Sequence, residues 1–154
     1  MAQLDVQGFD AFAADLEAAK SLTDEEAYTI LEAGGEVVKA AMQQMIVRLG
    51  LVLSGLLRDS IKIFRKKEDR PYVLIYPEGK HHITHGYGPD GRGTGARRTV
   101  NASEVGFVLE YGAAGRAVHA YHWMENAVEF AAEETTAAMQ EAFNEVLDAK
   151  GVGQ

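Results

Sequence analysis

The stretch that most constrains the fold runs from Thr23 to Leu49, and it opens with a helix start signal. Thr23 stands three residues before Glu26, the spacing of a capping box, in which the Thr23 hydroxyl accepts from the Glu26 N–H and the Glu26 side chain reaches back. Hydrophobic residues then recur every three or four positions, as in a helix with one buried face. They are Ile30, Leu31, Val37, Val38, Ala41, Met45 and Leu49. The pattern predicts a long helix over about residues 24–49, in which Gly34 and Gly35 indicate either a bend or very close packing.

The two ends of the chain also carry helical patterns. Residues 120–150 show the same three-to-four spacing in Met124, Ala127, Ala131, Thr135, Ala138, Met139, Ala142, Phe143 and Val146. We therefore expect a second long helix there, and Gly151 lies just beyond its end, where a glycine commonly stops a helix. At the other end, Leu4, Phe9, Phe12 and Leu16 predict an N-terminal helix within a helical arm of residues 1–22.

The residues between the long helices carry strand signals. The stretches DSIKIFRKK and PYVLIYP are alternating or β-branched runs joined by a polar, basic turn, which is typical of an antiparallel hairpin. The stretch EVGFVLEYG places Phe107, Leu109 and Tyr111 at alternate positions and ends at Gly112, so it predicts a third strand with Glu110 near its centre.

These elements predict one domain over residues 1–154, of the α+β class. It has an N-terminal helix and a long helix, a small antiparallel sheet of about three strands, and a long C-terminal helix packed on the sheet. Residues 79–103 are rich in glycine, and we expect them to form an extended flexible loop within the domain.

Composition excludes several classes of protein. The chain has no cysteine, so disulfides, thiolate nucleophiles and thiolate metal sites are ruled out. No apolar run is long enough to span a bilayer and no signal peptide is evident, so we expect no membrane partner. The net charge of −8 conceals an asymmetry, because residues 58–98 hold ten Lys and Arg against five Asp and Glu. One basic region therefore lies on an otherwise acidic body.

Two motifs suggest chemistry, but neither fits a known template. His81, His82 and His85 have a spacing that can converge on zinc or nickel, yet no predicted helix or fixed carboxylate would hold them in place. The stretch GYGPDGRGTGARR has the glycine density of a phosphate-binding loop without the flanking strand and helix that such loops need. We therefore expect no catalytic residue, no metal and no cofactor.

Other functions stay open on the residues alone. The basic residues of the hairpin and loop, with Tyr72, Tyr76 and Tyr87 nearby, are compatible with weak phosphate and base contacts in a DNA-binding accessory protein. A metal-dependent enzyme using Glu110 and the three histidines is a further alternative.

Three short motifs, in this order along the chain, resemble one known family. The first motif lies at a helix-to-strand junction, and its residues here are Ser54, Gly55, Leu57, Ser60 and Ile61. The second motif is an acidic residue, any residue and then a glycine, and it corresponds to Glu110, Tyr111 and Gly112. The third motif begins the last helix, and it corresponds to Trp123, Met124 and Ala127. Together they are similar to the gp-ten-like family of tailed-phage neck proteins, over about residues 33–147.

The resemblance implies a non-enzymatic virion protein, made in the host cytoplasm, that forms a homo-oligomeric ring in the neck of a siphophage-like particle. A six-fold or twelve-fold ring would join a head-closure, stopper or adaptor protein to the tail terminator or tail tube, with possible non-specific contact to DNA in its lumen. Tail-completion protein, minor tail protein and tail terminator are related roles. The subunit or partner interface is then expected at Arg65, Lys66, Lys67, Arg70, His81, His82, His85, Tyr87, Arg92, Arg97 and Arg98.

Overall fold

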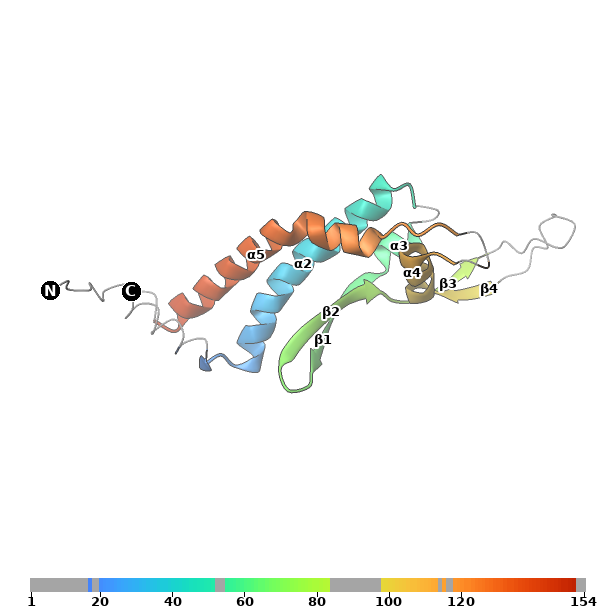
Figure 1. Cartoon of the computed structure of the whole chain (residues 1–154). Helices are drawn as coiled ribbons and strands as arrows, with labels where there is room; N and C mark the ends of the chain where they lie inside the picture. Colours follow the sequence, from blue (N-terminus) through green and yellow to red (C-terminus); the bar gives the residue numbers. More distant parts are fainter. Residues whose placement is uncertain are drawn as a thin grey trace, which may run out of the picture.

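The computed structural model describes residues 17, 20–51, 55–83, 98–113, 115 and 118–151, with the backbone alone at 81–83 and 98. Figure 1 shows the arrangement of the elements. They are α2 (Asp24–Arg48), α3 (Leu56–Asp59), β1 (Ile61–Lys67), β2 (Pro71–Pro77), β3 (Lys80–Ile83), β4 (Arg98–Asn101), α4 (Ala102–Tyr111) and α5 (Trp123–Ala149). The predicted α+β class is confirmed.

Helix α2 begins at the predicted capping box. The Thr23 N–H donates to Glu26 Oε2 at 2.7 Å, and the Glu26 N–H donates to Thr23 Oγ1 at 3.3 Å. The Thr23 backbone N–H, with Lys150 close by, lowers the pKa of the Glu26 carboxyl. The predicted end of the helix, near Leu49, lies within one residue of the observed end at Arg48.

The two glycines of α2 allow the layers on either side of it to approach closely. A Cβ on Gly34 would lie 2.6 Å from Met139 Cγ on α5, and one on Gly35 would lie 3.2 Å from Ile63 Cδ1 on β1. Close packing is therefore the reason for this pair of glycines. Helix α2 forms the middle layer, with α5 packed along one side and the hairpin on the other.

The hairpin formed by β1 and β2 has the predicted antiparallel pairing, from Ile61 opposite Pro77 to Lys67 opposite Pro71. The layering differs from the sequence expectation in one respect. Helix α5 packs mainly on α2, which separates most of it from the hairpin (Figure 1).

The predicted third strand is wrong, because Ala102–Tyr111 is helix α4. Its buried positions are Ala102, Gly106 and Glu110, which recur every four residues. The alternation of Phe107, Leu109 and Tyr111 is typical of a strand, but of these three only Leu109 packs against the core, and the fully buried residues of α4 are small or polar.

Both ends of the predicted 79–103 loop are paired. Strands β3 and β4 form a second two-stranded antiparallel sheet, with Lys80 opposite Asn101 and Ile83 opposite Arg98. Residues 84–97 lie outside the described residues. The predicted N-terminal helix does so as well, apart from Glu17 and Lys20, which are helical, and the Ser21 N–H donates to the Glu17 carbonyl at 3.2 Å.

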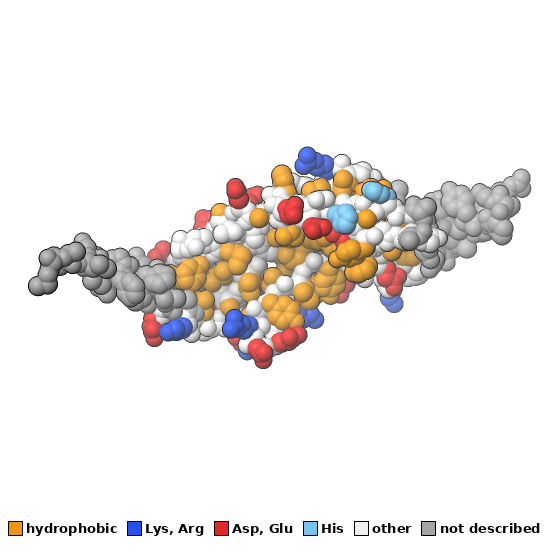
Figure 2. Space-filling model, viewed as in Figure 1, with side chains coloured by type: hydrophobic (Ala, Val, Ile, Leu, Met, Phe, Trp, Pro, Cys, Tyr) orange, Lys and Arg blue, Asp and Glu red, His pale blue; other side chains and the backbone are white. Residues whose placement is uncertain are grey.

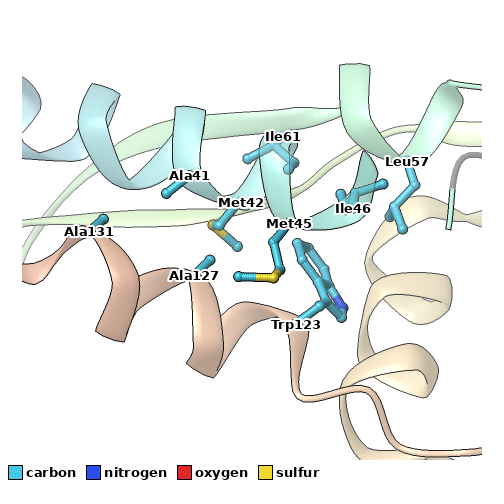
Figure 3. Packing of buried hydrophobic residues seen from close by; sticks show 9 residues of the cluster. All are labelled: Ala41, Met42, Met45, Ile46, Leu57, Ile61, Trp123, Ala127 and Ala131. Carbon is cyan, nitrogen blue, oxygen red and sulfur yellow. The ribbon is translucent and has the colours of Figure 1, made fainter. Parts of the chain in front are cut away.

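The core lies where α2, α3, β1 and the start of α5 meet. Its fully buried large side chains are Ile46, Ile61 and Trp123. Figure 3 shows the Trp123 ring next to Met45, with the small residues Ala127 and Ala131 following along α5. Because alanines occupy this face of α5, the two long helices can pack closely.

Candidate functional site

The first motif residues form the junction between α2 and β1. Gly55 precedes α3 with a φ of 73°, a left-handed conformation that favours glycine. The buried Ser60 hydroxyl donates to the Leu57 carbonyl at 2.7 Å, and the Leu57 and Ile61 side chains enter the core. Ser54 lies outside the described residues. The described members of this motif therefore serve the fold.

Two glycines allow α4 and the residues after it to pack closely on their neighbours. Gly112 has a φ of 75°, and a Cβ there would lie 2.8 Å from the Val118 carbonyl oxygen. Gly106 was not singled out from the sequence, but a Cβ on it would lie 2.9 Å from Pro77 Cγ, and its carbonyl accepts from Trp123 Nε1 at 2.9 Å. A glycine is required at Gly112, while Gly106 brings α4 against Pro77 and Trp123.

The buried carboxylate of Glu110 caps helix α5. It accepts from the Met124 N–H at 2.6 Å and from the Glu125 N–H at 3.3 Å. His122, at the N-cap position, has a left-handed backbone with φ 49° and forms no side-chain cap. Glu110 therefore supplies from α4 the acceptor that a helix N-terminus needs, and its negative charge lies at the positive end of the helix dipole.

Glu110, His122 and Glu125 are the described residues that come closest to a metal site. Their ligand atoms lie within 4.8 Å of one another, and His122 Nδ1 is 3.4 Å from Glu125 Oε2. Both Glu110 oxygens are already hydrogen-bonded to backbone N–H groups, and the positive end of α5 opposes a cation. We interpret the cluster as a helix cap.

The alternative metal site of Glu110 with the three histidines is not tested by the described part of the chain. Glu110 is described, but His85 lies outside the described residues, as do the side chains of His81 and His82. The sequence reasoning did not connect His122 and Glu125, which stand three residues apart, to Glu110.

Two of the predicted interface cations are engaged within the chain. Arg65 Nε donates to Glu32 Oε1 at 2.6 Å, and Arg65 Nη1 donates to Glu25 Oε2 at 2.8 Å. Lys67 pairs with Asp24 in the first turn of α2. The hydrogen bonds from Arg65 lower the pKa of the Glu32 carboxyl, and both acidic partners raise the pKa of the Arg65 guanidinium. Acidic residues of α2 thus neutralise Arg65 and Lys67.

The other predicted interface residues have different positions. Lys66 and Arg70 are exposed at the tip of the hairpin, and the Lys66 carbonyl accepts from the Tyr28 hydroxyl at 2.9 Å. Tyr87, Arg92 and Arg97 lie outside the described residues, as does the side chain of Arg98. Their assignment to an interface stays a prediction.

Large hydrophobic side chains on α4 are exposed. Phe107 is 62 % exposed and Tyr111 is 61 % exposed, and their ring centroids lie 4.6 Å apart. Phe130, on α5, is also exposed. Figure 2 shows a band of hydrophobic side chains along the middle of one face, with charged side chains mainly at its margins. Such surfaces are typical of proteins that bind other proteins.

The fold is of the α+β class, and the described motif residues hold the junctions between its elements. Comparison with known families then identifies the family. The model described as "Bacteriophage HK97-gp10, putative tail-component" matches residues 10–88, just over half of the chain, and the chain belongs to this family. The family resemblance is thereby confirmed.

The extent of the match differs from the expected 33–147. The helix-to-strand motif lies within the matched residues, whereas Glu110 and Trp123 lie beyond them. None of the curated proteins and none of the solved structures compared with the chain gives a significant match. Among the described helices, none is both long and apolar enough to cross a membrane.

Proposed function

We propose that this tail-component family member is a structural, non-catalytic neck or tail-completion protein, which forms a ring at the head–tail junction. The observation that carries the proposal is the exposed Phe107–Tyr111 pair on α4. Burying one aromatic side chain stabilises a contact by roughly 2 kcal/mol. A ring requires that two different surfaces of each subunit meet, and this pair provides one of them.

The charges of α5 limit how subunits could be arranged. Between Trp123 and Ala149 the helix carries seven Asp and Glu and no Lys or Arg. Copies of such a helix would repel one another if they were packed side by side. We therefore place α5 away from the contact between subunits, and α4 at that contact.

The remaining partners follow from the proposed position. One side of the ring would contact the head-closure, stopper or adaptor protein, and the other side the tail terminator or tail tube. Because Arg65 and Lys67 are paired with α2, the exposed Lys66 and Arg70 are the hairpin side chains that could offer positive charge to DNA in the lumen. A six-fold or twelve-fold ring remains part of the proposal.

Light scattering and electron microscopy of the purified chain test ring formation. We expect the wild type to form a closed ring and the double variant Phe107→Ser/Tyr111→Ser to be monomeric with an unchanged circular dichroism spectrum. The matched control is Phe130→Ser, which removes an equally exposed aromatic from α5 and should leave the ring intact. A monomeric wild type at all concentrations would contradict self-assembly.

Particles made without this protein test its position in the virion. A neck or tail-completion protein should leave DNA-filled heads and finished tails that do not join. Tails of irregular length would instead indicate the tail terminator role. Complete, infectious particles would overturn both assignments.

A further inference from the structure

The hairpin has two faces, and only one of them is covered by α2. The side chains of Ile63 and Ile75 point toward Gly35 on α2, and Arg65 reaches Glu32 on the same helix. Since side chains alternate along a strand, the residues between them point to the opposite face. We call this opposite face the outer sheet face.

The outer sheet face is formed by three cross-strand pairs. They are Lys62 with Tyr76, Phe64 with Leu74, and Lys66 with Tyr72. The Phe64 and Tyr76 rings stack with centroids 4.5 Å apart, and Leu74 is 41 % exposed. Of the described elements, α2 covers the other face, and α4 meets β2 at Pro77. The centre of the outer sheet face is therefore apolar, and none of the described elements covers it.

Prolines restrict how a partner could approach the hairpin. The Glu78 N–H donates to the Ser60 carbonyl at 2.8 Å, continuing the register of the ladder. In β2, every second residue therefore directs its backbone N–H and C=O positions away from β1, and Pro71 and Pro77 are among these residues. Proline has no N–H, so this edge is poorly suited to adding another strand. A partner is better accommodated on the face than at this edge.

We propose that residues 4–16 of a neighbouring copy pack as a helix across the outer sheet face, an inference that rests on the proposed self-assembly. The segment is amphipathic, with Leu4, Phe9, Phe12 and Leu16 at roughly helical spacing. A helix of this length is about 20 Å long, and a seven-residue strand spans about 20 Å as well. One such helix therefore matches the length of the hairpin.

The charges of the two surfaces also favour packing of residues 4–16 on the outer sheet face. Residues 1–16 carry three aspartates and no Lys or Arg. Within the described part of the chain, the Lys66 ammonium makes no ion pair, while Lys62 pairs with Glu78 at 3.0 Å. Packing of the acidic segment would therefore bring its carboxylates near an available cation.

The connection to α2 indicates that the segment comes from another copy. Helix α2 starts on the covered side of the hairpin, where Asp24 pairs with Lys67. The carbonyl of Ser21, before α2, accepts from Lys150 Nζ at 3.0 Å, and Lys150 also pairs with Glu26 at 2.9 Å. Lys150 follows directly on α5, which packs on the side of α2 away from the hairpin. The chain therefore enters α2 from the α5 side, and the outer sheet face of the same copy lies beyond both α2 and the hairpin.

Cysteine cross-linking tests the contact directly, because the chain has no native cysteine. Full-length Phe12→Cys and Leu74→Cys proteins are purified separately, mixed, and oxidised under mild conditions. We expect a disulfide-linked product of about twice the chain mass that contains one copy of each variant. The control mixture pairs Phe12→Cys with Phe130→Cys, whose position is more exposed than Leu74 but lies on α5. It should give little of this product.

Three results would overturn the inference. They are an equal yield in the control mixture, no mixed product, or a double variant Phe12→Cys/Leu74→Cys that cross-links only within single chains. Light scattering on the same samples separates this failure from failure of the proposed function. A wild-type ring without the cross-link refutes the contact alone, whereas a wild type that never self-associates refutes both.

Discussion

The replacement Glu110→Gln tests whether a carboxylate on α4 holds the start of α5. Glu110 accepts two backbone N–H groups, at 2.6 and 3.3 Å, and is almost fully buried. The amide has one acceptor oxygen, so one of these N–H groups would face an NH2 group, at a cost of about 1–3 kcal/mol. Loss of the charge at the helix N-terminus adds roughly 1–2 kcal/mol. We expect a total loss of about 2–5 kcal/mol.

Thermal and urea unfolding followed by circular dichroism at neutral pH measure this loss. For a chain of this size, about 2–4 °C in Tm corresponds to 1 kcal/mol, so Tm should fall by at least about 4 °C. The matched control is Glu129→Gln on the exposed side of α5, which should change stability by less than about 0.5 kcal/mol. A Glu110→Gln protein as stable as the control would refute the capping role. A wild-type Tm that falls on addition of EDTA, with no such fall in Glu110→Gln, would instead indicate a metal at Glu110, His122 and Glu125.

Three further replacements test the surrounding structure. Gly112→Ala should destabilise the protein by at least about 2 kcal/mol in urea unfolding, because it combines a left-handed backbone with a backbone clash; a neutral result would contradict the φ of 75°. Trp123→Phe removes the hydrogen bond to the Gly106 carbonyl and part of a fully buried side chain, so we expect a loss of roughly 2 kcal/mol by the same assay. Glu32→Gln should lower stability at neutral pH but not in acid, since the pKa of Glu32 is depressed by Arg65. The stability that this carboxylate contributes is present above its unfolded pKa, near 4.5, and is lost as the pH falls through the lower folded pKa. The unfolding free energies of wild type and variant should therefore converge in acid. A difference that stays constant across pH would contradict the ion pair.

The long helices and the hairpin could be predicted because their local signals agree with their packing. The capping box of Thr23 and Glu26 fixes the start of α2, and its hydrophobic stripe faces the core. In the hairpin, Ile63 and Ile75 alternate with polar or partly exposed neighbours, as expected for a sheet with one covered face.

Helix α4 could not be predicted from hydrophobic periodicity, because its two aromatic residues are exposed and only Leu109 among its large apolar residues packs against the core. Its buried face consists of Ala102, Gly106 and Glu110, while Phe107 and Tyr111 are exposed. The spacing of four between the buried residues, and an acid three residues after Asn101, were the available signals for a helix. The ion pairs of the hairpin were also out of reach, since they join residues about forty positions apart, whose proximity depends on the tertiary fold.

The positions of the charged and aromatic side chains indicate which kind of contact would hold the subunits together. The sequence alone predicts that the basic residues of the hairpin and loop form the interface. Arg65 and Lys67 already pair with α2, however, so pairing them with a neighbouring subunit would break existing ion pairs and add little binding free energy. Burial of the exposed Phe107 and Tyr111 requires no such exchange. Salt distinguishes the two modes, because the Debye length falls from about 10 Å at 0.1 M to about 3 Å at 1 M. A ring held by the aromatic surface should persist at 1 M salt in light scattering, whereas dissociation over this range would show that charged contacts dominate the interface.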